Sequence, residues 1–160
     1  EGLLSAIAHD LKLRVERFEI GIEHETRQIS ARFDASSLRV VCAMKNGLAA
    51  NTSLNAKDRA EIEANIIKEV LDAQRHPFIT FESSTIHRVA NGYQVGGSLK
   101  IRGKERLIEA TANKLGGELV LKMHLNQPDY GIRVFSAALG ALRIRPEVLV
   151  ELCVPAELEP

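Results

Sequence analysis

The sequence predicts an all-β fold, an eight-stranded antiparallel barrel with one inserted amphipathic helix, in a single domain over residues 1–160. Three observations lead to this prediction. Apolar and polar residues alternate through most of the chain, which is the period of a strand with one buried face. One segment instead carries apolar residues at helical spacing. Short turn signals join the strands in sequence order, and eight such strands are enough to close a barrel around one ligand.

Three strands are predicted before the helix. In "LKLRVERFEIGI" (11–22) the apolar positions change parity after Val15, which predicts a bulge near Glu16 or Arg17. "RQISARFD" (27–34) alternates, and "SLRVVCA" (37–43) is apolar enough to be covered on both faces. The short segments "EHET" and "ASS" join these strands, so we expect a meander.

The helix is predicted to begin at the N-cap Asn55 and to end at about Gln74 or Arg75, because Pro77 disfavours helix at the residue before it. A helix of about 20 residues is about 30 Å long, enough to lie across a barrel mouth or along its wall. Its apolar residues recur at steps of three and four, at Ile62, Ile66, Ile67, Val70 and Leu71.

Five more strands are predicted after the helix. They are "FITFESSTI" (78–86), "YQVGGSLKI" (93–101), "ERLIEATAN" (105–113), "ELVLKMHLN" (118–126) and "EVLVELCV" (147–154). The pair Asn91-Gly92 is a strong hairpin signal between the first two. Gly96-Gly97 lies inside a strand, which indicates a bend or a place where another group approaches the backbone closely.

Composition excludes several classes of function. Lys plus Arg equals Asp plus Glu, 21 of each, so no basic excess predicts a nucleic-acid partner. No apolar run reaches the roughly 18 residues of a membrane-spanning helix. The printed residues hold no signal peptide, so a cytoplasmic location stays open. Cys42 and Cys153 each lie in an apolar run and are interpreted as two buried thiols, with a disulfide as the alternative.

The sequence predicts no catalytic residue, no metal ligand and no cofactor of catalysis. His9 and Asp10 are adjacent, but neighbouring side chains of a strand point to opposite faces, so they form no dyad there. No phosphate-binding loop precedes a helix. The remaining histidines are not at metal-ligand spacing; they are His24, His76, His87 and His124.

The predicted inner face mixes large apolar side chains with small ones. Small residues leave volume that branched and aromatic side chains would otherwise fill, and such a cavity suits an apolar ligand. An ordinary packed core is the alternative interpretation of the same pattern. The small residues in question are Ala31, Gly97, Ala110 and Ala112.

Four segments resemble the YceI-like family of lipocalin-like, polyisoprenoid-binding barrels. "GLLSAIAHDLKLRVERFEIGIE" (2–23) is similar to the opening strands of the family, and "LNAKDRAEIEANIIKEVLDAQRHPFITFES" (54–83) to its helix, proline and following strand. "NGYQVGGSLKIRGKERLIE" (91–109) resembles its central hairpin. "DYGIRVFSAALGALRIRPEVLVEL" (129–152) looks like its closing segment, in which a glycine-containing loop and a short helix precede the last strand.

The resemblance implies a bacterial binding protein and not an enzyme, often periplasmic or secreted. Its ligand would be an apolar long-chain molecule such as an isoprenoid or an isoprenoid quinone, held inside the barrel, with "SAALGAL" (136–142) walling off the tail. Residues expected to line the ligand are Leu13, Val15, Phe33, Phe81, Leu99, Ile101, Leu121, Met123 and Leu142.

Two other hypotheses stay open from the sequence. In the first, the barrel is fully packed and the protein is an interaction or stress-related scaffold that forms a homodimer. In the second, the protein is a hydrolase that uses His9 and Asp10 with a distant nucleophile. A dry interior and a large interface would favour the scaffold, and turnover that depends on His9 would favour the hydrolase.

Overall fold

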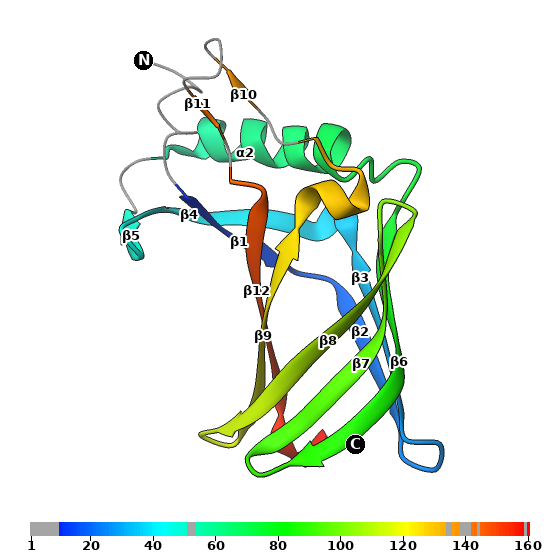
Figure 1. Ribbon diagram of the computed structural model, residues 1–160. Helices are drawn as coiled ribbons and strands as arrows, with labels where there is room; N and C mark the ends of the chain where they lie inside the picture. Colours follow the sequence, from blue (N-terminus) through cyan, green and yellow to red (C-terminus); the bar gives the residue numbers. More distant parts are fainter. Residues whose placement is uncertain (1–9, 51–53, 134–135, 138–141, 144, 159) are drawn as a thin grey trace.

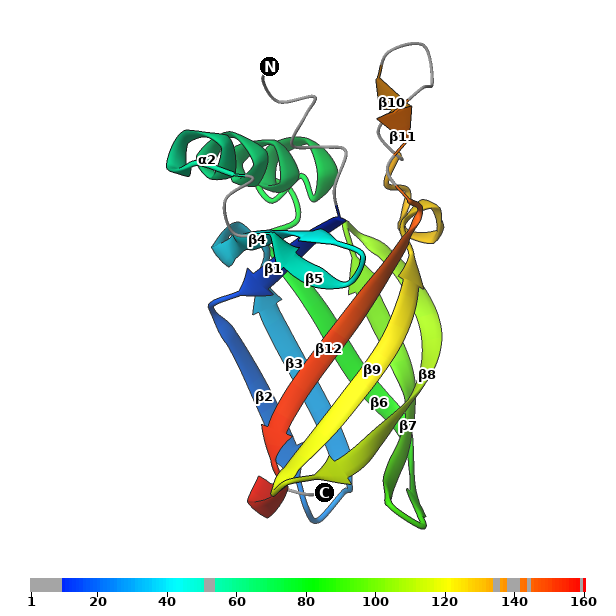
Figure 2. The same cartoon turned by 90° about the vertical axis from the view of Figure 1, so that its left-hand side faces the viewer.

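Two curled antiparallel sheets form a half-barrel with one helix across its end (Figures 1 and 2). The computed structural model describes residues 10–50, 54–133, 136–137, 142–143, 145–158 and 160. The larger sheet has seven strands in the order β12-β9-β8-β7-β6-β3-β2. These strands are β2 (Phe18–Glu23), β3 (Gln28–Asp34), β6 (Phe78–Val89), β7 (Gly92–Ile101), β8 (Lys104–Leu115), β9 (Glu118–Asn126) and β12 (Glu147–Pro155).

The smaller sheet has three strands in the order β1-β4-β5, which are β1 (Asp10–Val15), β4 (Leu38–Lys45) and β5 (Leu48–Ala50). Within the described residues no ladder joins the outer strands β12 and β2 of the larger sheet. The all-β, antiparallel character of the prediction is confirmed. The closed barrel of eight strands is not, because the strands divide between two sheets.

The predicted bulge near Glu16 is the corner between the two sheets. β1 ends at Val15 and pairs with β4, whereas β2 begins at Phe18 and pairs with β3. Hydrogen bonds fix this corner: the Arg17 backbone N–H donates to Ser37 Oγ at 2.9 Å, and the Asp34 N–H donates to the Arg17 carbonyl at 2.9 Å. The parity change in the sequence therefore marks where the chain passes from one sheet to the other.

The helix begins where predicted and ends earlier. Helix α2 (Ala56–Asn65) has a capping box, in which the Asn55 side chain accepts from the Asp58 N–H and the Asp58 side chain accepts from the Asn55 N–H. A π-helical turn, Ile66–Val70, follows. The prediction of an end at Gln74 or Arg75 was wrong, because Asp72 adopts a left-handed backbone with φ 49° and stops the helix there.

Apolar packing concentrates where α2 and its π-helical turn meet the end of the half-barrel. Leu38, Leu71 and Leu99 belong to one cluster at this end, and Val40 and Ile62 belong to a second cluster between β4 and α2. A third cluster, with Tyr93 and Leu119, lies farther along the larger sheet. The helix therefore covers one end of the half-barrel, as expected from its length.

Three details of the prediction need correction. Cys153 is exposed, because odd-numbered residues of β12 face outward, whereas Cys42 is buried; both thiols are free. In the closing segment, where the resemblance implied a short helix, Ser136–Ala137 (β10) and Leu142–Arg143 (β11) form a strand pair. The three-residue strand β5 was not predicted. No helix in the described part of the chain is long and apolar enough to span a membrane.

Candidate functional site

The inner face of the half-barrel is the candidate site. Directly opposed residues of antiparallel strands share a face, and the register of β9 with β12 pairs Leu121 with Leu152 and Met123 with Val150. Leu121 packs on the cluster of Tyr93, and Met123 on the cluster of Leu99. These four side chains therefore point into the half-barrel, where they are half-buried.

The structure brings five of the predicted ligand-lining residues together. Leu99 and Ile101 of β7 are buried in the cluster next to α2, and Met123 packs against it. Phe81 of β6 packs against this cluster and against the one that holds Leu121. Phe81 therefore links the two ends of a continuous apolar inner surface.

The other four predicted residues lie elsewhere or outside the description. Phe33 of β3 is half-buried and stacks at 5.8 Å, centroid to centroid, against Phe18 of β2. Val15 is half-buried opposite Leu38, and Leu13 is 36% exposed at the irregularity in β1, outside the three clusters. The backbone of Leu142 belongs to β11, and its side chain lies outside the described residues.

Small residues make room on the inner face. Gly97 is the exception, because the Phe81 ring already covers it: a Cβ built on Gly97 would be 2.7 Å from Phe81 Cζ and closer still to the Glu82 carbonyl oxygen, so no side chain fits there. The close approach predicted from Gly96-Gly97 is confirmed. Ala110 and Ala112 of β8 are buried on the same face. Their short side chains leave the neighbouring Leu121 partly accessible.

Tyr130 is a polar residue of this region that sequence reasoning missed. It lies in the 3₁₀ turn Gln127–Tyr130 and is only 2% exposed, in the cluster next to α2. Burial raises the pKa of its phenol, and the nearby Arg106 guanidinium opposes this shift. A single aromatic residue in a turn carries no periodic signal, and only the tertiary structure shows its burial.

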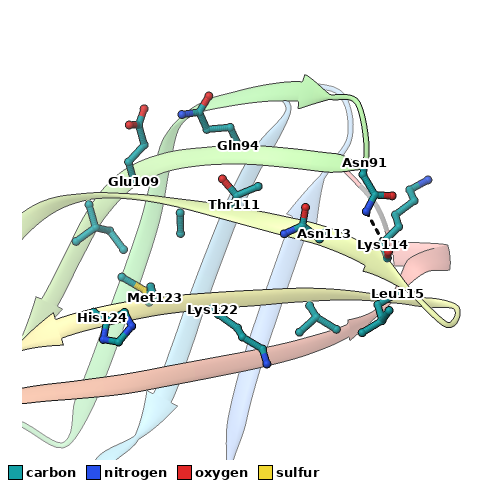
Figure 3. A pocket seen from close by; sticks show the side chains of 13 residues that line it. Asn91, Gln94, Glu109, Thr111, Asn113, Lys114, Leu115, Lys122, Met123 and His124 are labelled. Carbon is teal, nitrogen blue, oxygen red and sulfur yellow. Dashed lines mark hydrogen bonds between the residues drawn. The ribbon is translucent and has the colours of Figure 1, made fainter.

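A pocket of about 810 Å³ opens where β8 and β9 part (Figure 3). Its lining includes residues of the inner face, Ile108, Ala110 and Met123, together with residues of the outer face such as Glu109 and His124. Figure 3 shows the two strands together near Leu115 and apart near His124. The pocket therefore reaches both faces of the sheet.

The described residues offer little for catalysis or metal binding. Asp10 is exposed on β1, and His9 lies outside the described residues. Among the residues that the structure describes, no group of three His, Cys, Asp or Glu side chains could hold a metal ion.

A family model, the YceI-like domain, matches residues 6–156. BcnA from Burkholderia cenocepacia is 15% identical, with a TM-score of 0.55, over 89% of this chain and 82% of that chain. A YceI protein from Campylobacter jejuni is 12% identical, with a TM-score of 0.61, over 91% of this chain and 85% of that chain. No curated protein matches the sequence. Since the model covers nearly the whole chain and the solved structures share its fold, the chain belongs to the YceI-like family.

Proposed function

We propose that this protein binds an apolar isoprenoid- or lipid-like chain inside the half-barrel, as a carrier or a store and without catalysis. The observation that carries the proposal is the inner face itself. Its apolar side chains on β9 and β12, such as Leu121 and Leu152, remain half-buried in the folded protein. An apolar surface inside a concave sheet is stabilised when a ligand of the same character removes it from water.

The length of the ligand tail supplies most of the affinity in this proposal. Each buried methylene contributes about 0.8 kcal/mol, so a chain of ten carbons outweighs any single polar anchor. Ala110 and Ala112 keep their part of the inner face free of bulky branches, which leaves a path along the strands. The family resemblance favours an isoprenoid or an isoprenoid quinone over other apolar molecules.

An inward charge tests the proposal. Leu121→Arg places a guanidinium on the inner face of β9, where an apolar tail would have to desolvate it. We expect the protein to lose its co-purified ligand and its uptake of retinol, an isoprenoid alcohol. Leu149→Arg is the matched control, because Leu149 is exposed on the outer face of β12. Equal ligand content in Leu121→Arg, Leu149→Arg and the unmodified protein would refute the proposal.

A packed scaffold that forms a homodimer is the second candidate. It is favoured by exposed leucines on the outer surface, of which Leu107 and Leu115 lie on β8 and Leu48 on β5. Sedimentation equilibrium separates the candidates. A stable dimer whose interior takes up no retinol would place the scaffold first, whereas a retinol-binding monomer would remove it.

A further inference from the structure

The wall of the half-barrel is parted between β8 and β9. The ladder between these strands runs from Leu115↔Glu118 to Thr111↔Lys122 and extends no farther. β8 nevertheless continues back to Lys104 and β9 on to Asn126. Extending the register sets Met123–Asn126 of β9 opposite Leu107–Ala110 of β8. These segments are extended but not paired, and we call the opening between them the slot.

Each of the two strands that border the slot is paired with its other neighbour in the sheet. β8 pairs with β7 from Gly92↔Asn113 to Ile101↔Lys104, which includes all of β8 beside the slot. β9 pairs with β12 as far as Asn126↔Glu147. The parting is therefore local to one seam, and the rest of the sheet stays continuous around it.

Both ends of the slot are closed. At one end the paired residues Thr111 and Lys122 join the strands. At the other end the 3₁₀ turn Gln127–Tyr130 contacts β8, and Arg102 Nη1 donates to the Gly131 carbonyl at 2.7 Å. A bounded opening in a wall differs from a frayed edge, because its width is set at both ends.

The slot changes in character from outside to inside. Extending the register of Thr111↔Lys122 places Glu109 opposite His124 on the outer face and Ala110 opposite Met123 on the inner face. We call the residues that border the slot on each face its lips. The outer lip is polar: it is formed by Glu109, His124 and Lys122, and the Lys122 ammonium donates to Glu151 Oε2 at 2.8 Å. The inner lip is apolar and leads to the surface formed by Leu121 and its neighbours. Leu107, beside the lip on β8, is 84% exposed.

We propose that the slot between β8 and β9 is the lateral entrance through which the apolar tail of the ligand passes into the half-barrel. This inference rests on the proposed binding function. A tail entering here moves from Leu107 past Ala110 and Met123 directly onto the inner face. The end of the half-barrel nearest the slot is covered by α2 and its π-helical turn, whose apolar residues pack on Leu99 and Leu38. The opening in the wall therefore offers a path that does not displace the helix.

Chemical modification of the outer lip, which would block the slot with a bulky group, tests the entrance. In a Cys153→Ser background, Glu109→Cys and His124→Cys each place one thiol on the outer lip, and His87→Cys places one on the outer face of β6, away from the slot. Each thiol is reacted with N-phenylmaleimide, and mass spectrometry verifies a single adduct because Cys42 is buried. Retinol is then added to protein that has been freed of detergent and of any co-purified apolar ligand, and its fluorescence reports the rate and the final amount of uptake.

If the slot is the entrance, we expect the maleimide adduct at Glu109→Cys or at His124→Cys to slow retinol uptake by about tenfold or more, while the final amount of retinol bound stays the same. Capping His87→Cys leaves the rate unchanged. If both capped lip variants take up retinol as fast as their uncapped forms, the ligand enters elsewhere and the inference is overturned. Failure of the uncapped protein to bind any retinol is a different result, since it overturns the binding function and the entrance with it.

Discussion

Thr111 and Lys122 are the last paired residues of the β8–β9 ladder, and beyond them the two strands separate while each keeps its other neighbour. Backbone groups that point into the slot from β8 before Thr111 have no partner in β9. Pairing within a sheet is what protects backbone amides from exchange with solvent. The end of this ladder therefore has a consequence that can be measured residue by residue.

Amide hydrogen exchange should change abruptly at this pair. We expect the slot-facing amides of Leu107–Ala110 to exchange much faster than the β9-facing amides of Thr111–Leu115, as resolved by NMR. The amides of β8 that face β7 serve as the internal control, because that ladder is complete. Uniform protection along both edges of β8 would show that β8 and β9 are hydrogen-bonded along the slot in solution, and would contradict the parting.

Gly97→Ala should destabilise the fold. The added Cβ would meet the Glu82 carbonyl oxygen and, at 2.7 Å, the Phe81 ring, and overpacking of this kind costs about 1–3 kcal/mol. Urea unfolding measures the loss, with Lys100→Ala, an exposed residue on the other face of the same strand, as the control. In a Phe81→Leu background most of the cost of Gly97→Ala should remain, because the Glu82 carbonyl oxygen of β6 is the nearest atom and stays in place. A cost that disappears there would assign the clash to the Phe81 ring alone.

Asp34 should make the stability of the fold depend on pH in the acid range. Hydrogen bonds from Ser36, and then the guanidinium of Arg17 at 2.8 Å, lower the pKa of Asp34 to about 2. Because this pKa lies below that of the unfolded chain, the carboxylate stabilises the fold above about pH 4, and this contribution is lost as the pH falls towards 2.

The variant Asp34→Asn isolates this contribution. Near pH 7 we expect it to lower the free energy of unfolding by about 1 kcal/mol, the usual scale for such a hydrogen bond. Near pH 2 the variant and the unmodified protein should approach each other in stability. Glu19→Gln is the control, since its contact with Arg32 is longer, at 3.9 Å, and exposed. A difference that persists unchanged at low pH would contradict the assigned role of the carboxylate.

The two cysteines should differ in reactivity. Cys153 is exposed on the outer face of β12, whereas Cys42 is 4% exposed within β4. We expect one thiol per chain to react rapidly with Ellman's reagent and the second only when denaturant is added. Cys153→Ser should remove the fast phase and leave the slow one. Two fast thiols in the native protein would show that β4 is not buried as described.

Much of the strand framework was predictable because alternation reports directly which side chains face the core. The strands from Phe78 to Asn126 and the N-cap Asn55 follow from this pattern and from local capping chemistry. The helix end at Asp72 was missed, because a left-handed residue other than glycine has only a weak signal in sequence. The interpretation of Cys153 as a buried thiol was wrong, because an apolar run around a residue does not show that the residue itself faces the core.

The parting of β8 from β9 could not be predicted, and the reason is physical. Ile108 and Ala110 alternate with polar residues as they would in a fully paired strand. Alternation records which face of a strand is buried and says nothing about which backbone edges are hydrogen-bonded. In the same way, Phe81 and Leu99 were expected on the inner face and lie there, but the clusters that join them come from tertiary packing.

The central claim is that the half-barrel carries an apolar chain. Mass spectrometry of an organic extract from natively purified, detergent-free protein tests it most directly, because it needs no assumption about the ligand. We expect one isoprenoid, isoprenoid quinone or similar long-chain molecule in an amount stoichiometric with the protein. A folded sample whose extract contains no apolar molecule would contradict it.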